Sequence, residues 1–462
     1  MFGINFNFLR GLNGPAPRYT SYPTIPEWSD CASPAPALEA LYDLDNRKES
    51  PLSLYFHIPF CRTMCLYCAC SVVLNRNPEV ESRYVDTLMK EIDLVCEIIG
   101  TNRRVTQLHF GGGTPTKIAP KLFEKLFDKI VNSFRIDFSK ELNIEIDPRT
   151  SLPGTTGDPK FLRSLGFNRV SLGIQDLDPK VQEAVRRRQT EHQSVSTYKE
   201  ARSVGFESIN MDFIYGLPKQ TPQSFSQTIE KILQLCPDRI ALFSFAKVPW
   251  VKRHQKAIKD QHLPDMEKKF RIYSESRKAL TNAGYLPIGM DHFALPHDEM
   301  AKSFLDKTLI RNFQGYSLPL ANDLIGFGMT ATGFVGTTYL QNAKTLSEYE
   351  NTINSQTLAT RKYKILSKDD RIRKWVIHTI MCSFFVDKKI FSSLFGEDFD
   401  KYFASSSPRI IGMESAGLVH NSPESLTVTP LGEMFVRVIA TAFDAYLLNK
   451  TDPITNLFSS SI

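Results

Sequence analysis

The chain has 462 residues, 42% of them hydrophobic and 23% charged, with 56 Lys and Arg against 50 Asp and Glu. This composition is typical of a globular protein of two or three domains, and the small positive excess suits an anionic small-molecule ligand rather than nucleic acid. No run of about 20 apolar residues occurs, and the start of the chain lacks the features of a signal peptide. We therefore expect a cytoplasmic monomer without nucleic-acid or membrane partners.

Residues 1–45 contain six prolines, too many for a helix or a central strand, and predict an extended N-terminal arm. Within the arm, residues 17–24 read Pro-Arg-Tyr-Thr-Ser-Tyr-Pro-Thr. A guanidinium at Arg18, two phenols and several hydroxyls in so short a span could line a site for an anionic aromatic ligand. The alternative is an arm that lies on the surface of the next domain.

From Pro51 onward, short apolar runs alternate with longer amphipathic stretches. The apolar runs predict strands at about 52–58, 105–111, 141–147, 169–175, 208–215 and 239–246. The amphipathic stretches predict helices at about 79–99, 120–133, 158–165, 178–204 with a break, and 222–235. Six strand–helix units predict an α/β fold with a parallel β/α barrel that is incomplete, because about eight units are needed to close one.

Four of the eight cysteines follow the first predicted strand within ten residues. Cys61, Cys65 and Cys68 are spaced C-x3-C-x2-C, which places three thiolates on one short loop, where they could bind three corners of an iron–sulfur cube. The fourth iron would remain open to a small molecule. The best-known use of this spacing is to hold S-adenosylmethionine on a [4Fe–4S] cluster, so the loop resembles that of the radical SAM superfamily.

Three other interpretations of the cysteines remain open. Structural zinc sites usually contain two spaced pairs of ligands, and no second pair occurs here. A closed cluster held by all four cysteines would have to span the single residue between Cys68 and Cys70. Disulfides would require an oxidising compartment, which nothing in the chain indicates. The role of Cys70 is left open.

Each predicted strand ends on residues that are unusual for a buried strand, and β/α barrels carry their chemistry at these ends. Buried carboxylates and amides are costly unless something pairs with them. A polar ligand lying across the barrel mouth would pair with these groups. After the cysteine loop of the first strand, the strands end on Gly112, Gly113 and Thr114, then on Glu145, Gln175, Asp212 and Ala246.

Three further features near these ends have two interpretations each. In the run Arg186-Arg187-Arg188, two residues are expected to face solvent, and one could point inward to pair with a ligand carboxylate. His57 is either a hydrogen-bonded core residue or part of the site. Tyr55 and Tyr67 are ambiguous in the same way.

After the sixth strand we expect a helix at about 262–283 and a loop-rich extension that includes the glycine-rich residues 326–336. Residues 46–360 would thus form the barrel with its extension, and residues 361–462 a mainly helical C-terminal domain. The end of that domain is predicted to be helical over 426–448. From residue 367 onward, 10 Lys and Arg stand against 11 Asp and Glu, which argues against DNA binding and favours a lid over the barrel.

Several of these motifs together resemble the oxygen-independent coproporphyrinogen III oxidases. They are the arm sequence 17–24, Tyr-Phe-His-Ile-Pro-Phe-Cys at 55–61, the cysteine spacing, Gly-Gly-Gly-Thr-Pro-Thr at 111–116, residues 210–218, Met-Asp-His-Phe-Ala at 290–294 and Phe-Gln-Gly-Tyr at 313–316. The resemblance implies a radical SAM enzyme of haem biosynthesis. It would convert coproporphyrinogen III to protoporphyrinogen IX by oxidative decarboxylation of two propionates, with an electron donor and acceptor that are not identified.

The resemblance also implies roles for individual residues. Cys61, Cys65 and Cys68 would hold a [4Fe–4S] cluster. The family is thought to bind two molecules of S-adenosylmethionine, the second beside Gln175, Arg187 and Asp212. Ala69 and Thr332 depart from the usual family residues. The cofactor contacts implied in this way are Tyr55, Tyr67, Gly112, Gly113, Thr114, Glu145, Gln175, Arg187, Asp212, Ala246 and Thr332.

Two rival functions would keep the same barrel. A haem chaperone of the superfamily would bind haem without decarboxylation, but that group lacks the arm motif and differs at the position of Cys70. A radical SAM enzyme with another substrate, such as a methyltransferase, is disfavoured by the arm and by residues 290–294.

Overall fold

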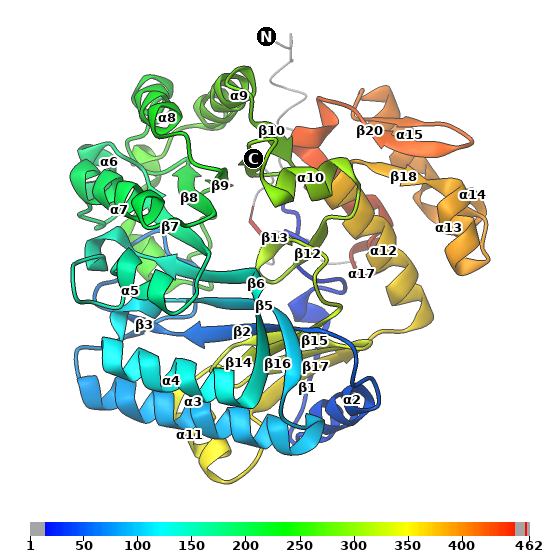
Figure 1. Ribbon diagram of the computed structural model, residues 1–462. Coiled ribbons are helices and arrows are strands. Elements are labelled where there is room, and N and C mark those ends of the chain that lie inside the picture. Colours follow the sequence, from blue (N-terminus) through cyan, green and yellow to red (C-terminus); the bar gives the residue numbers. More distant parts are fainter. Residues whose placement is uncertain (1–13, 449–457, 460–462) are drawn as a thin grey trace.

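The computed structural model describes residues 14–448 and 458–459 (Figure 1). The predictions for residues 1–13, and for the last part of the C-terminal domain at 449–457 and 460–462, lie outside the described residues. In the described part, no helix is both long and apolar enough to cross a membrane.

A 13-stranded sheet forms the centre of the structure, and seven neighbouring strands in it are parallel. Antiparallel strands extend it beyond β9 (Arg239–Ser244), with β11 (His292–Ala294) and β10 (Leu286–Ile288), and beyond β14 (Asp323–Phe327), with β15 (Thr332–Val335), β16 (Thr338–Asn342), β17 (Thr360–Ile365) and β1 (Ser29–Asp30). Because β9 and β14 do not pair, the barrel stays open, as predicted. The parallel strands are, in spatial order, β14 (Asp323–Phe327), β2 (Leu52–Ile58), β5 (Arg103–Gly112), β6 (Phe134–Ile146), β7 (Arg169–Gln175), β8 (Ser208–Tyr215) and β9 (Arg239–Ser244).

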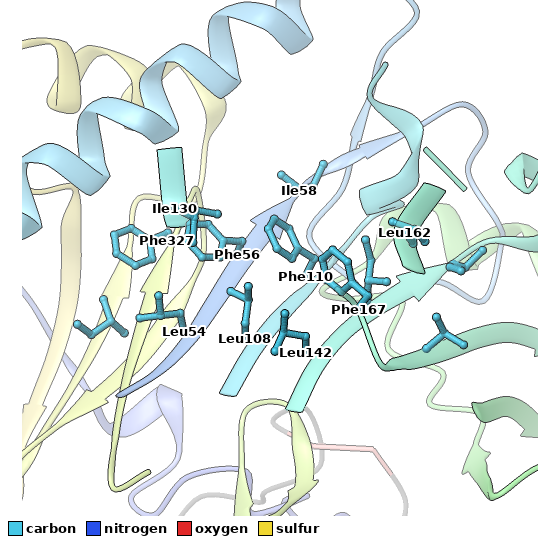
Figure 2. Packing of buried hydrophobic residues seen from close by; sticks show 14 of the residues in the cluster. Leu54, Phe56, Ile58, Leu108, Phe110, Ile130, Leu142, Leu162, Phe167 and Phe327 are labelled. Atoms are coloured by element: carbon cyan, nitrogen blue, oxygen red, sulfur yellow. The ribbon is translucent and has the colours of Figure 1, made fainter. Parts of the chain in front are cut away.

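Alternating residues of β2 explain how the sheet packs. Leu54, Phe56 and Ile58 are fully buried toward the helices, and Figure 2 shows them beside residues of the neighbouring strands. The Phe56 ring stacks on Phe110 of β5 at 5.1 Å and on Phe327 of β14 at 4.9 Å between centroids. Burying one such side chain contributes about 1.5–3 kcal/mol, so this aromatic layer holds the half-barrel together.

Helices follow the parallel strands and cover their apolar face. Figure 1 shows α3 (Pro78–Ile99), α4 (Pro120–Ser133) and α11 (Leu346–Asn354) side by side along this face. Several begin with a proline in the first turn after a capping side chain, such as Asn77 before α3 and Asp158 before α5. All the helices predicted for the barrel are confirmed to within a few residues. They are α3 (Pro78–Ile99), α4 (Pro120–Ser133), α5 (Pro159–Ser164), α6 (Pro179–Ala184), α7 (Glu191–Ser203), α8 (Pro222–Leu235) and α9 (Met266–Asn282).

The arm differs from the predicted extended segment in one respect, and the structure also decides between the two interpretations of residues 17–24. Residues Ala35–Asp45 form a helix, α2, because proline is tolerated in the first turn, where its missing N–H has no partner to lose. The arm is also not laid on the surface. Tyr19 and Tyr22 are fully buried in a second apolar core, and Arg437 donates to the carbonyl of Pro17. The first described residues are therefore part of the interior.

The glycine-rich residues 326–336 do not form a loop as predicted. They contribute to β14 and β15, and β14 lies parallel to β2, so Gly326 is the neighbour of Tyr55. A Cβ at Gly326 would lie 2.7 Å from the Thr332 carbonyl oxygen. Glycine is thus needed where two strands approach closely, and this requirement does not distinguish a strand from a loop in the sequence.

The C-terminal part is mainly helical around the second core, with a three-stranded sheet ordered β18-β20-β19. The helix predicted from residue 426 is wrong at its start, since Ser425–Val428 form β20. Strand β17 carries the main sheet across the predicted boundary at residue 361. The elements are α12 (Lys368–Ser383), β18 (Phe385–Asp387), α13 (Lys388–Phe395), α14 (Phe399–Tyr402), α15 (Ser407–Ser415), β19 (Val419–Asn421), β20, α16 (Val436–Ala440) and α17 (Ala445–Leu448).

Candidate active site

A cavity of about 520 Å³ runs from the carboxyl ends of the parallel strands along their inner face. Its size is in the range of small-molecule sites. Twelve of the fourteen residues expected to bind cluster or cofactor line it, namely Cys61, Cys65, Tyr67, Cys68, Gly112, Gly113, Thr114, Glu145, Gln175, Arg187, Asp212 and Ala246.

The cysteine loop is held at one end of this cavity by short strands and backbone bonds. β3 (Phe60–Cys61) pairs with β4 (Val73–Leu74), and the N–H of Leu66 donates to the Val185 carbonyl at 2.9 Å. Cys70 also lines the cavity. Within the described residues, no three His, Cys, Asp or Glu side chains converge as they would around one metal ion.

Two arginines point at the middle cysteine. Arg149 Nη2 lies 3.8 Å and Arg187 Nη1 3.7 Å from the Cys65 sulfur, and both guanidinium groups pair with Asp147. Burial raises the pKa of Asp147, but the charges of Arg187 and Arg149 outweigh burial and hold that pKa below its usual value. Three thiols on one cavity wall, with fixed positive charge beside them, fit an anionic cluster held by thiolates.

Arg187 is the inward-pointing member of the arginine run. It is 5% exposed, whereas Arg186 and Arg188 face solvent, so that expectation is confirmed. Its Nε donates to Gln189 at 3.0 Å and its Nη2 to the Gly173 carbonyl at 2.5 Å. Arg187 is therefore held beside Cys65 by protein groups, and any contact with a cofactor carboxylate remains a prediction.

The glycine run of β5 is set directly against the strand that leads into the cysteine loop. Gly112 has φ +124°, and a Cβ there would lie 2.9 Å from the His57 ring. A Cβ on Gly113 would lie 2.5 Å from the Pro59 carbonyl oxygen. Side chains at either position would push the cysteine loop away, so the run is needed for structure as well as for access to the cavity.

Glu145 and Asp212 bring carboxylates to the cavity wall. Glu145 accepts from the Gly112 N–H at 3.2 Å and lies 3.5 Å from His109 Nε2. Asp212 accepts from Ser171 at 2.9 Å and Asn210 at 2.7 Å. Burial, with a contribution from the Glu145 charge, raises the pKa of Asp212 to about 6. The wall thus presents oxygens that could accept from an ammonium or hydroxyl group.

Two predicted residues, Tyr55 and Thr332, do not line the cavity. The Tyr55 hydroxyl is hydrogen-bonded to His57 Nδ1 at 3.1 Å, and a Cβ on Gly111 would touch both Tyr55 and Glu145. Thr332 lies on β15, two strands beyond β2, and its hydroxyl lies 3.4 Å from the Thr330 carbonyl. His57 also bonds the Ser71 carbonyl at 2.9 Å, as expected of a hydrogen-bonded core histidine. Cofactor contacts by Tyr55 and Thr332 remain predictions.

The polar residues deeper on the inner face were not predicted from the sequence. Every second residue of the parallel strands points into the half-barrel, and many of these are polar, which is a detectable period-two signal in otherwise apolar strands. At the floor, Arg239 pairs with Asp298 at 2.6 Å. The missed lining residues on the parallel strands include His109, Glu141, Asn143, Ser171, Asn210 and Arg239.

The arm contributes Arg18 to the cavity wall. Its Nη2 donates to the Ser244 carbonyl at 2.9 Å, while Nη1 lies 3.4 Å from Asp291, a long ion pair. The Arg18 carbonyl accepts from Arg311 at 2.9 Å. Of the four arginines that line the cavity, Arg18 has the most exposed side chain, at 30%.

The open parallel barrel and its cysteine loop define a radical SAM protein, and the sequence profile of the Radical SAM superfamily matches residues 55–232. The chain is 39% identical over 443 residues to the oxygen-independent coproporphyrinogen III oxidase of Pseudomonas aeruginosa, covering 96% of this chain and 95% of the relative. Its counterpart from Synechocystis is 40% identical over 459 residues, 98% of this chain and 97% of the relative. The solved structure of coproporphyrinogen III oxidase from Escherichia coli, described as a radical SAM enzyme, is 36% identical and superposes with a TM-score of 0.89 over 96% of this chain and 99% of its own. The chain therefore belongs to the oxygen-independent coproporphyrinogen III oxidases.

Proposed function

We propose that this chain converts coproporphyrinogen III to protoporphyrinogen IX by oxidative decarboxylation of two propionates, without oxygen. The observation that carries the proposal is the cavity itself, where the three spaced cysteines of a chain of this family share one wall with fixed arginines. When bound, the [4Fe–4S] cluster and S-adenosylmethionine supply reductive cleavage of a C–S bond and a carbon radical that can abstract hydrogen from the substrate.

The residues of the chain would bind and orient these groups. Cys61, Cys65 and Cys68 would hold the cluster, with Arg149 and Arg187 balancing its charge. Glu145 would accept from the ammonium of S-adenosylmethionine beside the glycine run. A second molecule of S-adenosylmethionine would lie beside Gln175, Arg187 and Asp212, which we propose on the family resemblance and on their place in the cavity.

Arg18 is the best placed residue to meet a substrate propionate. Its side chain is 30% exposed, more than that of any other arginine lining the cavity, and its pair with Asp291 is a long one of 3.4 Å through a single guanidinium nitrogen. A guanidinium can exchange such a pair for a two-point contact with a ligand carboxylate. The buried arm around Arg18 would also limit the access of water to the reacting carbon.

The experiment is an isotope transfer. The anaerobically reconstituted protein would be given reductant, S-adenosylmethionine and coproporphyrinogen III deuterated at the propionate β-carbons. We expect deuterium in the 5′-deoxyadenosine that is released. Unlabelled deoxyadenosine with unchanged substrate would contradict the proposed substrate, and tight haem binding without deoxyadenosine would instead favour a haem chaperone.

A further inference from the structure

A basic segment that follows β9 lies against the back of the cysteine loop. Three of its side chains bind consecutive parts of that loop through carbonyl oxygens. Gln255 Nε2 donates to Tyr67 at 3.0 Å, His254 Nε2 bonds Cys68 at 2.8 Å, and Lys252 Nζ donates to Cys70 at 2.8 Å.

This attachment is fixed from the interior. Gln255 is fully buried, donates also to the Ala246 carbonyl at 3.2 Å, and accepts from the Val248 N–H at 2.6 Å. A buried side-chain amide with its partners in place is costly to move. The segment therefore keeps one position relative to Cys68 and Cys70.

The outer side of the segment is strongly positive. Over residues 246–263 there are five Lys and Arg and one acid, Asp260, which pairs with Lys247. Arg253, Lys256 and Lys259 are exposed, and their side chains have no ion pair or hydrogen bond within the described residues. Arg62 in the cysteine loop and Arg76 just beyond it are also exposed.

Two apolar side chains are exposed beside these cations, Trp250 at 45% and Val251 at 63%. Aromatic residues surrounded by a polar or charged rim are typical of protein interfaces. Weak electron-transfer complexes have interfaces of small area. We define the docking surface as Trp250, Val251, Arg253, Lys256 and Lys259.

We propose that this docking surface receives an acidic one-electron carrier protein that reduces the cluster. The inference rests on the proposed function, in which each cleavage of S-adenosylmethionine consumes one electron. That electron leaves the carrier, which is oxidised, and enters the cluster, which is reduced, with no bond made between the proteins. The hydrogen bond from His254 to the Cys68 carbonyl gives the electron a short path from the docking surface to the cysteine loop. An excess of positive charge raises the local concentration of an acidic partner and its rate of association.

The test compares two triple variants of the cluster-loaded protein. One is Arg253→Glu, Lys256→Glu and Lys259→Glu. The matched control, Lys389→Glu, Lys401→Glu and Arg409→Glu, changes the same residue types at exposed positions of α13, α14 and α15, which Figure 1 shows across the molecule from β3. The probe is an acidic plant-type [2Fe–2S] ferredoxin, with dithionite as the small-molecule reductant.

We expect the first variant to bind oxidised ferredoxin at least about tenfold more weakly than the control at low ionic strength. Cofactor cleavage driven by reduced ferredoxin should slow to a similar extent, and both differences should shrink at high salt. Cleavage driven by dithionite should match that of the control. Equal ferredoxin binding and equal ferredoxin-driven rates in the two variants would overturn the docking surface. Failure of the unaltered protein to cleave S-adenosylmethionine with dithionite would contradict the proposed function, and the binding comparison would then still decide the docking surface.

Discussion

The outer and inner faces of the parallel strands carry different kinds of residue, although they belong to the same strands. On β2, Leu54, Phe56 and Ile58 face the helices and are fully buried, while the intervening Tyr55 and His57 point to the inner side of the sheet and are hydrogen-bonded. In an ordinary closed barrel the interior is filled by apolar side chains. Here the open barrel leaves room for ligands, so the inner face is polar. Stability therefore depends mainly on one face and chemistry on the other.

The largest effect should follow from removing a cysteine of the loop. Cys65→Ala should abolish cofactor cleavage, because it removes one of the three thiolates assigned to the cluster. Iron and sulfide content and 5′-deoxyadenosine formation would be measured after anaerobic reconstitution. Cys96→Ala, on the helical side, is the matched control and should keep both. A loaded cluster with turnover in Cys65→Ala would refute the ligand assignment.

On the outer face, Phe56→Ala should lower the free energy of unfolding by about 3–5 kcal/mol, because the ring is fully buried and stacked on both sides. Urea unfolding of the cluster-free protein would measure the change. Phe56→Leu should cost less, since it leaves a smaller cavity. A Phe56→Ala protein of unaltered stability that has lost cofactor cleavage would break the separation of the two faces.

At the arm, Arg18→Ala should raise the KM for coproporphyrinogen III about tenfold to a hundredfold, the value of one charge-assisted hydrogen bond. Cofactor cleavage without substrate should be unchanged, because Arg18 has no contact with the cysteine loop in any hydrogen bond or ion pair described. Steady-state kinetics with Arg18→Lys as the conservative variant would show partial recovery. An effect on kcat alone would assign Arg18 to positioning rather than to substrate binding.

The smallest effect concerns Asp212, whose pKa is raised from 3.8 to about 6 by burial. The protonated carboxyl favours the folded state, so this stabilisation is complete below pH 3.8 and is lost as the pH rises through about 6. Asp212→Asn should therefore stabilise the cofactor-free protein by about 1–2 kcal/mol above that range and by less below it. Thermal unfolding at about pH 5 and about pH 7.5 would measure this. An equal shift at both pH values would exclude the carboxylate as its cause.

The strands and helices of the barrel could be predicted because each is a local pattern of apolar residues with capping or proline signals. The cysteine loop and the residues at the strand ends could also be predicted, because their spacing and position are local features of the sequence. The position of β14 could not, because its pairing with β2 joins residues far apart in the chain, and its glycines are equally typical of a loop.

The role of the arm was also beyond local patterns. Its prolines and polar residues left two interpretations open, a surface segment or part of a ligand site, and only the structure decides between them: Tyr19 and Tyr22 are buried against the C-terminal helices and Arg18 reaches the cavity. The deeper polar residues, such as Asn210 and Arg239, were visible as a period-two pattern. They were not recognised because the prediction considered only the residues at the carboxyl ends of the strands, where β/α barrels carry their chemistry.

The most direct test of the account is to follow coproporphyrinogen III by mass spectrometry in an anaerobic reaction with the reconstituted protein, reductant and S-adenosylmethionine. The account predicts two successive losses of CO2 and two hydrogens, each accompanied by 5′-deoxyadenosine. A fully loaded cluster that releases deoxyadenosine and leaves every propionate intact would contradict it.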